Sequence, residues 1–506
     1  MVAALPMLLA AAAVLVPPQP ILGLSLNDGG TSSSRRTRDE RFVILGGTGR
    51  IGTAVASHLL RRAPDGSRVV LVGRDECRGR DAVGEVLDEN PVVARNGGGD
   101  DDEEEEGGGG VVVTFRKCDY RNYVELREVV SGCTCLIHVA GPYLDENPTP
   151  LRAAIDDPTC RAYVDVSDPL EYIEKSLEMY DDAIASGTSA LLAAGAFPGM
   201  SNVMAVEAAS TLIRRRGADG EGGAVRDVRF NYFTAGLGGS GDVNLYITNL
   251  GFGEAMSQYD GGIVRPFEAL SGSILGRVKF YLDDSEMSDR DESSSSSSSS
   301  SCGFGNDEAR SRVGERTVFA WPFPEAATVP AELGILGGSS AAMGTAPDVW
   351  NDVLGLLVAI VPRALWRSRR FSKFIADFSR PLVRATDALL RLASPDGVGE
   401  THAMRVDATG TDGCAVSIVQ AHESFRRCVG QSCAEFALDL LEQPCPGVRL
   451  PEQRYRDDGP RGKIIERLTS TPGTFAYTGP VSVISAPPPS ELEKALEKAK
   501  MAETKR

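Results

Sequence analysis

Glycines spaced as G-x-G-x-x-G carry the clearest chemical signal in the chain. Gly47, Gly49 and Gly52 follow the apolar run Phe42 to Leu45, and Gly46 also fits the related G-x-x-G-x-x-G spacing. After a buried strand, such glycines allow a tight reversal, leave room for a pyrophosphate against bare backbone, and let the next helix pack closely. The pattern predicts a dinucleotide-binding loop formed by Gly46, Gly47, Thr48, Gly49, Arg50, Ile51 and Gly52.

The end of the next expected strand, residues 69–72, bears on which dinucleotide binds. Arg74 could pair with a ribose 2′-phosphate and favour NADP, whereas Asp75 could accept from a 2′-hydroxyl and favour NAD. Arg74 lies closer to the strand end, and no acidic residue ends the strand itself. We therefore expect NADP, with NAD as the alternative; a solvated surface arginine is the other interpretation of Arg74.

Alternating apolar strands and amphipathic helices continue to about residue 214, which predicts a doubly wound parallel sheet of the Rossmann type. Ligands enter such sheets at the carboxyl ends of the strands. We therefore expect the nicotinamide to be bordered by the turn after residues 135–139, which consists of Ala140, Gly141, Pro142 and Tyr143. Asp119, after a third strand, either lies near the adenine or caps a helix.

Three side chains are candidates for a proton donor, and the sequence does not rank them. Asp165 lies inside an apolar strand and needs a partner or a site to justify its burial. Tyr143 ends the turn after the fourth strand. His138 lies within that strand, where we favour a packed histidine over a catalytic one.

Composition excludes several classes of partner. The formal net charge of −17 argues against nucleic acid. The ten cysteines and four histidines are too scattered for a metal site, so buried free thiols are expected. We expect a small-molecule substrate instead.

The N-terminal 40 residues resemble a targeting segment. Residues 3–16 are apolar over 14 positions, the length of a signal-peptide core, and residues 27–38 are rich in Ser, Thr and Arg. This arrangement fits delivery to a plastid by way of an ER-type signal. The secretory pathway and the cytoplasm are the alternatives.

Two low-complexity inserts, 96–110 and 284–312, are expected to be disordered because they cannot bury apolar area. Trp350 to Arg370 joins an apolar run to a basic one and is too short to span a bilayer. We favour a buried helix there; docking on a membrane surface, or closing a homodimer or a substrate tunnel, are alternatives.

Four segments in order resemble the saccharopine dehydrogenase family, specifically its saccharopine dehydrogenase-like oxidoreductase branch. They are GGTGRIG at 46–52, HVAGPY at 138–143, AYVDVSD at 162–168 and AGAFPGMSN at 194–202, joined by a late segment at 428–453. The chain departs from the family pattern at His138 and at Asp168, where the family has glycine. These departures bear on the substrate more than on the cofactor.

The resemblance implies a Rossmann domain at 41–214, a second α+β domain at 225–422, a returning helix at 424–455 and a tail at 456–506. It also implies hydride transfer to or from an imine or secondary amine. Short-chain dehydrogenases are an unlikely class because none of the twelve tyrosines has a lysine four residues later. A membrane-surface reductase of lipid metabolism and a non-catalytic nucleotide-binding scaffold are the alternatives.

Overall fold

The computed structural model describes most of the chain between residues 40 and 483. The described ranges are 40–91, 94–96, 110–218, 224–235, 246, 249–253, 255–260, 263–268, 276–283, 303–321, 323–346, 349–393, 400–411 and 413–483. The targeting-like segment, most of both inserts and the end of the expected tail lie outside these ranges.

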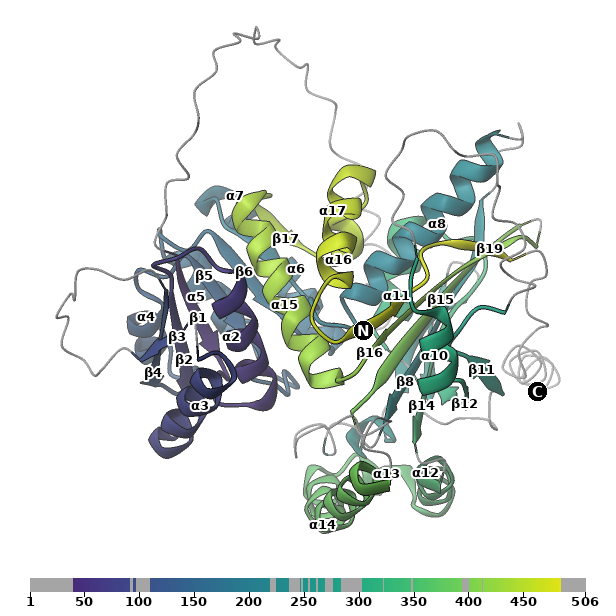
Figure 1. Ribbon diagram of the computed structural model, residues 1–506, viewed down its shortest axis with the longest axis horizontal. Helices are drawn as coiled ribbons and strands as arrows, with labels where there is room; N and C mark the ends of the chain where they lie inside the picture. Colours follow the sequence, from purple (N-terminus) through teal and green to yellow (C-terminus); the bar gives the residue numbers. More distant parts are fainter. Residues whose placement is uncertain are drawn as a thin grey trace, which may run out of the picture.

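The first sheet has eight strands in the order β17-β7-β6-β5-β1-β2-β4-β3, and every pairing in it is parallel (Figure 1). This confirms the doubly wound sheet. Its strands are β1 (Arg41–Leu45), β2 (Arg68–Gly73), β3 (Ala94–Asn96), β4 (Val111–Lys117), β5 (Cys135–His138), β6 (Ala162–Asp165), β7 (Ser189–Leu191) and β17 (Gly447–Arg449).

Helices cover both faces of this sheet because its strands are apolar on both sides. In β1, Phe42 and Ile44 join one core, whereas Val43 and Leu45 join the other. The first core packs under α2 (Arg50–Arg62), α3 (Glu76–Glu89) and α15 (Phe425–Glu442). The second packs under α4 (Tyr123–Val130), α5 (Thr149–Asp156), α6 (Leu170–Leu177) and α7 (Tyr180–Ser186).

The second domain is built on a seven-stranded mixed sheet. β8 (Val225–Ala235) pairs parallel with β14 (Ser339–Ala346) and antiparallel with β15 (His402–Gly410). The other members are β13 (Phe319–Ala320), β16 (Ala415–His422), β18 (Thr474–Tyr477) and β19 (Val481–Val483). Two small antiparallel pairs are β9 (Ala255–Asp260) with β10 (Ile263–Glu268), and β11 (Arg277–Lys279) with β12 (Glu315–Thr317).

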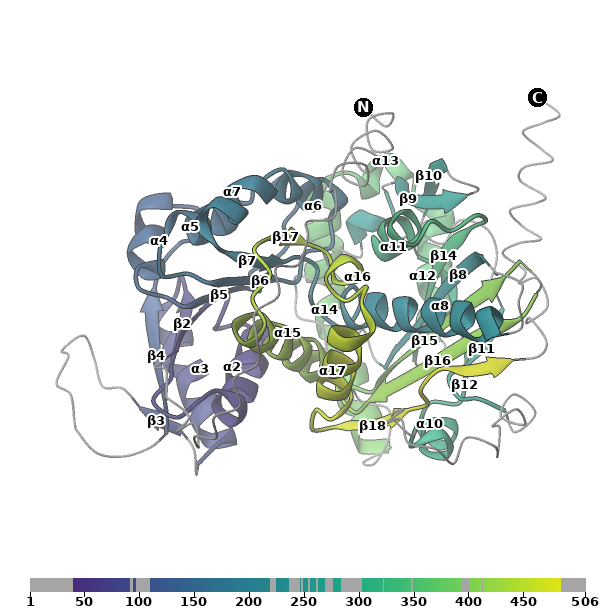
Figure 2. The ribbon, with the colours of Figure 1, turned by 90° about the horizontal axis from the view of Figure 1, so that it is seen from above.

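Two helices on one face of this second sheet join it to the first domain. α8 (Met200–Ala218) follows β7 of the first sheet and packs on β15 and β16 (Figure 2). α11 (Glu325–Leu333) packs on α8 and β8. A single apolar core therefore runs from the first sheet, through α8, to the second sheet.

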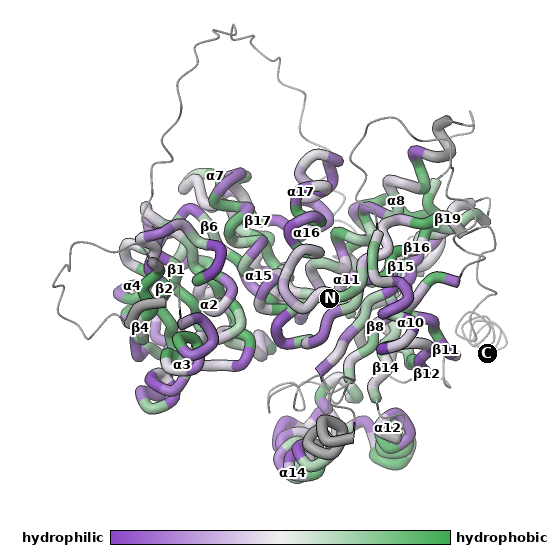
Figure 3. Tube along the Cα trace, in the orientation of Figure 1, coloured by the Kyte–Doolittle hydropathy of each residue, from purple (hydrophilic) through white to green (hydrophobic). Residues whose placement is uncertain are grey.

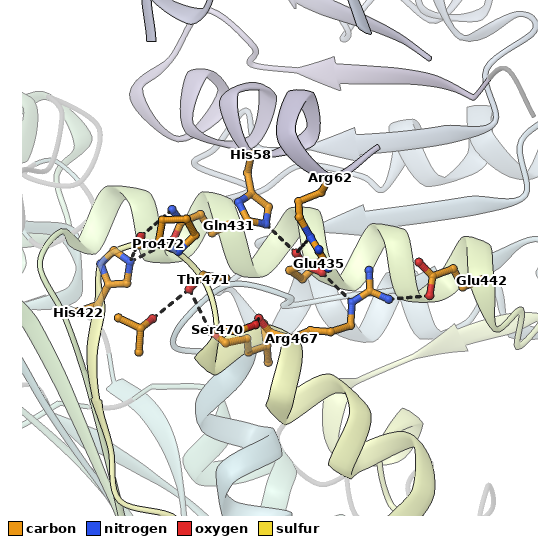
Figure 4. A network of polar contacts seen from close by, with 12 residues as sticks. His58, Arg62, His422, Gln431, Glu435, Glu442, Arg467, Ser470, Thr471 and Pro472 are labelled. Carbon is orange, nitrogen blue, oxygen red and sulfur yellow. Dashed lines mark hydrogen bonds and ion pairs between the residues drawn. The ribbon is translucent and has the colours of Figure 1, made fainter. Parts of the chain in front are cut away.

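The late helix α15 returns to the first domain and packs against α2. A Cβ on Gly430 would lie 2.7 Å from the Cβ of Ala54, so the helices approach closely at this glycine. Farther along the contact, the Glu435 carboxylate accepts hydrogen bonds from the Arg62 and Arg467 side chains and contacts His58 Nε2 at 2.7 Å (Figure 4).

The domain boundaries differ from the expectation in two places. The described part of the expected tail contains α17 (Asp458–Thr469), β18 and β19, after the short α16 (Pro451–Arg454). Residues 306–312, expected to belong to a disordered insert, form α10 (Asn306–Arg312). The Asn306 side chain binds both the N–H and the carbonyl of Leu282, and Phe304 pairs with Tyr477, so distant contacts hold α10 in place.

Trp350 to Arg370 is not the buried helix that we favoured. The segment forms most of α12 (Val349–Ile360), α13 (Arg363–Trp366) and the start of α14 (Arg369–Ala393), which together lie at the bottom of Figure 1. Trp366 is buried, whereas Leu356 and Ile360 are largely exposed. Among the described helices, none is long and apolar enough to cross a membrane.

Candidate functional site

The glycine loop joins β1 to α2 and leaves bare backbone at the helix start. Gly46 has a φ of +80°, which favours glycine, and a Cβ there would lie 2.9 Å from Ala140 Cα. A Cβ on Gly52 would lie 2.3 Å from the Gly46 carbonyl oxygen. The N-cap residue of α2, Gly49, has no side chain with which to cap the helix, so the first-turn N–H groups suit a phosphate.

Other residues of the loop hold it in place. A Cβ on Gly73, at the end of β2, would lie 2.7 Å from Thr48 Cγ2, so the loop rests on the neighbouring strand end. Ile51 packs against the core beneath α2. Arg50 forms a 3.0 Å ion pair with Glu400, which precedes β15, and so links the loop to the second domain.

The end of β2 presents an exposed cation, Arg74, and a hydrogen-bonded carboxylate, Asp75. Arg74 follows the strand and is exposed. Asp75 is the N-cap of α3, and its Oδ1 accepts from the N–H groups of Cys77 and Arg78. These hydrogen bonds lower the pKa of Asp75. The Asp75 carboxylate is thus occupied in capping α3.

Asp119 does not cap α4, so that alternative is wrong. Its Oδ1 accepts from the Arg121 N–H at 3.2 Å, and the N-cap of α4 is Asn122, which accepts from Val124. Asp119 is half-buried beyond β4.

The turn after β5 divides its residues between surface and core. Ala140, Gly141 and Pro142 are partly exposed beside the glycine loop. Tyr143, which has a φ of +62°, turns inward, and its buried hydroxyl donates to the His138 carbonyl at 2.6 Å. Burial raises the pKa of Tyr143 well above its ordinary value.

His138 is held between aromatic rings. Its centroid lies 5.1 Å from that of Tyr120 and 4.8 Å from that of Tyr143. Both ring nitrogens are buried, with no hydrogen-bond partner in the part of the chain that the structure describes. Burial lowers the pKa of His138 to about 3, so the imidazole is neutral at physiological pH.

Asp165 braces two loops from within the sheet. Its Oδ1 accepts from the N–H and the hydroxyl of Ser167 and from the Ala193 N–H, and its Oδ2 accepts from the Tyr163 hydroxyl. Burial raises its pKa, while these hydrogen bonds act in the opposite direction. Each oxygen of this fully buried carboxyl has a hydrogen-bond partner, as the burial of an acid inside an apolar strand requires.

Asp168, noted in the sequence only as a departure from the family pattern, occupies a distinctive position. Its side chain is exposed, yet desolvation by surrounding protein, reinforced by Asp165, raises its pKa to about 7. Asp168 follows β6 and lies among other protein groups while its side chain stays exposed. A carboxyl with a pKa near neutrality can both give and take a proton.

Glu325, at the start of α11, was missed in the sequence. It is fully buried, one oxygen accepts from the Tyr232 hydroxyl, and Oε2 has no hydrogen-bond partner among the described residues. Burial raises its pKa to about 8, and the charges of Asp168 and Glu452 act in the same direction. In the sequence, Glu325 looks like an ordinary acidic residue in the first turn of a helix.

Aromatic rings pack on Tyr232, the partner of this carboxyl, and an amide of α8 binds Glu452. Phe197 stacks on Tyr232 with a centroid distance of 4.3 Å, and Phe323 meets Tyr232 edge-on at 5.0 Å. Asn202 donates to Glu452 Oε2 at 2.8 Å from the first turn of α8. The segment after β7 thus meets β8 of the second domain through Phe197 and Tyr232.

The described residues contain no cluster of His, Cys, Asp or Glu that could hold a metal ion. No protein-family model matches the sequence, and no curated protein matches it.

Solved structures resemble this chain in fold. Apo saccharopine dehydrogenase (L-Glu forming) from Saccharomyces cerevisiae aligns over 86% of this chain and 98% of its own, with a TM-score of 0.52 and 12% identity. An NADPH-dependent quinone oxidoreductase from Escherichia coli covers 41% of this chain and 62% of its own, at 16% identity and a TM-score of 0.21. The first likeness shows that the two-domain fold is shared.

Proposed function

We propose that the chain is an NADP-dependent oxidoreductase of the saccharopine dehydrogenase-like type, which transfers hydride to or from an imine or secondary amine. The observation that carries the proposal is the contact between Gly46 and Ala140. It brings the glycine loop and the turn after β5 together at the carboxyl edge of the sheet, where dinucleotides bind in this class of fold. The fold shared with a saccharopine dehydrogenase supports the same reaction class.

The residues at this edge fit a dinucleotide. The backbone at Gly47, Gly49 and Gly52 and the start of α2 would receive the pyrophosphate. Arg74 is exposed where a ribose 2′-phosphate would lie, while Asp75 is engaged in capping α3. This difference between the two side chains favours NADP over NAD.

A carboxyl after β6 suits an amine substrate. When bound, the nicotinamide supplies or accepts the hydride. An imine also needs its nitrogen protonated, and Asp168, with a pKa of about 7, is the exposed carboxyl able to exchange that proton. The rings of Phe197 and Phe323 pack on Tyr232, whose hydroxyl binds the buried Glu325. The buried Asp165 holds the segments after β6 and β7 together through Ser167 and Ala193.

A fluorescence titration with NADPH and NADH tests the cofactor assignment. Arg74→Ala removes a charged partner of the 2′-phosphate and should weaken NADPH binding about tenfold or more while leaving NADH binding unchanged. Arg68→Ala, an exposed arginine at the other end of the same strand, is the matched control. Failure of the wild-type chain to bind either nucleotide would overturn the oxidoreductase assignment. An equal loss for both nucleotides in Arg74→Ala would overturn the NADP preference.

A further inference from the structure

The helices α12, α13 and α14 form a lobe with a core of its own. Trp366 and Phe252 are buried against each other, with ring centroids 5.3 Å apart, and Phe371 meets Trp366 at 5.4 Å. At the start of α14, Arg369 pairs with Asp145, which follows the turn after β5. The lobe is therefore packed internally and lies beside the candidate site.

The same lobe leaves large apolar side chains uncovered. Phe374, Phe378 and Leu382 are spaced by four residues and so share one face of α14. Figure 3 shows hydrophobic colouring on α12 and alternating polar and apolar residues along α14. The uncovered residues, here called the docking face, are Leu356 (59% exposed), Ile360 (67%), Leu365 (44%), Phe374 (62%), Phe378 (75%) and Leu382 (60%).

Basic side chains flank the docking face. Arg370, Lys373, Arg380 and Arg384 are spaced by three, seven and four residues and form a second stripe on α14 beside the apolar one. Asp377 lies within this stripe and pairs with Lys373 and Arg380, and the stripe as a whole stays cationic. Between residues 349 and 385 the sequence has seven Lys or Arg and two Asp, whereas the whole chain carries −17. The lobe is thus a local cationic region on an acidic protein.

We propose that this lobe docks on an anionic lipid membrane surface, with the docking face in the headgroup region and the arginines on lipid phosphates. Adjacent apolar and basic stripes are the arrangement by which interfacial helices bind bilayers. A second copy of the chain is a less suitable partner for the docking face. Joining two docking faces would bring two cationic regions together, and like charges across an interface oppose association.

Flotation of the full chain with phosphatidylcholine vesicles, with and without phosphatidylserine, tests this proposal. The wild type should float with the anionic vesicles, and added salt should weaken the binding. Phe374→Ser combined with Phe378→Ser should reduce the partition coefficient about tenfold or more, because two large apolar side chains no longer enter the headgroup region. Arg370→Gln combined with Arg384→Gln should reduce binding to anionic vesicles only.

Leu336→Ser is the matched control, since Leu336 is 61% exposed but lies outside the lobe. It should float like the wild type, and every variant retains the apolar N-terminal run. The proposal is overturned if the Phe374 and Phe378 variant floats like the control. It is also overturned if the wild type binds no vesicles and sedimentation shows a dimer that the same variant dissociates, which would make the docking face an interface between two copies.

Discussion

At the scale of single residues, burial decides which carboxyls of the site carry protons. Glu325 is fully buried and has one hydrogen bond donor, the Tyr232 hydroxyl, among the described residues. Desolvation raises its pKa to about 8 from an ordinary 4.5. At neutral pH the side chain is therefore a carboxylic acid, which adds no negative charge next to Asp168.

Replacing Glu325 with Gln should remove a pH dependence of stability. The folded state holds the Glu325 proton up to a pH of about 8, whereas the unfolded chain releases it near 4.5. The contribution of Glu325 to the free energy of unfolding is therefore full below about pH 4.5 and is lost as the pH rises through 8. Between about pH 5 and pH 8, the wild type should lose roughly 2–4 kcal/mol relative to Glu325→Gln. Urea denaturation followed by tryptophan fluorescence measures this difference, and parallel curves for both proteins would contradict it.

A polar residue within an apolar run of sequence can be recognised from the sequence as a residue that needs a partner. Asp165 stood out as an acid inside an apolar strand, and the structure supplies the partners that it needed. Glu325 did not stand out, because its burial depends on Tyr232, which is 93 positions away in the chain. Tyr143 was expected to border the nicotinamide, but its ring turns into the core. This direction follows from a positive φ, which the sequence does not predict.

At the scale of elements, the glycine loop depends on contacts that only backbone can make. A Cβ on Gly52 would lie 2.3 Å from the Gly46 oxygen and 2.6 Å from Gly47 Cα, and neither atom can move without shifting the loop. A Cβ on Gly84, inside α3, meets nothing within 4 Å. Close backbone packing therefore requires a glycine at position 52. At position 84 no contact requires one, and Gly84 only weakens the helix.

Gly52→Ala should displace the loop and lower NADPH affinity at least tenfold, because a shift of the bare backbone removes the pyrophosphate contacts. Gly84→Ala should retain affinity and raise the free energy of unfolding by about 0.5–1 kcal/mol through helix propensity. Fluorescence titration and urea denaturation of both variants measure the two effects. Unchanged NADPH affinity in Gly52→Ala would place the cofactor away from this loop.

The strands of the first sheet were predictable because burial on both faces produces continuous apolar runs. The end of the chain was harder to assign. α17 and β18 contain ordinary polar residues, and their place depends on distant partners. Arg461 is fully buried and donates to Glu207 of α8 at 2.7 Å, a contact that spans 254 positions. No local pattern marks such a residue as internal.

At the scale of the whole molecule, α15 and α17 fasten the first domain to the second. The Glu435 side chain is 2% exposed and is surrounded by His58 and Arg62 of α2 and by Arg467 of α17 (Figure 4). Burial acts to raise its pKa, but hydrogen bonds from these partners outweigh burial and hold the pKa at about 2. Because α2 begins at the glycine loop, this network also fixes where the loop stands relative to the second domain.

Glu435→Gln should therefore destabilise the whole chain. The substitution keeps the size of the side chain but removes the Glu435 charge from Arg62 and leaves the mostly buried Arg467 with the exposed Glu442 alone, a change that costs about 2–4 kcal/mol. The Glu435 contribution to the free energy of unfolding is present above an ordinary pKa of 4.5 and is lost as the pH falls toward 2, so the variant and the wild type should converge in acid.

Glu442→Gln is the control. The Glu442 carboxylate also binds Arg467, but it is 60% exposed, and its substitution should cost less than about 1 kcal/mol. Urea denaturation at neutral and acid pH separates the two variants. Equal losses in both would mean that α15 is held to α2 by apolar packing at Gly430 and Ala54, with the charged network adding nothing.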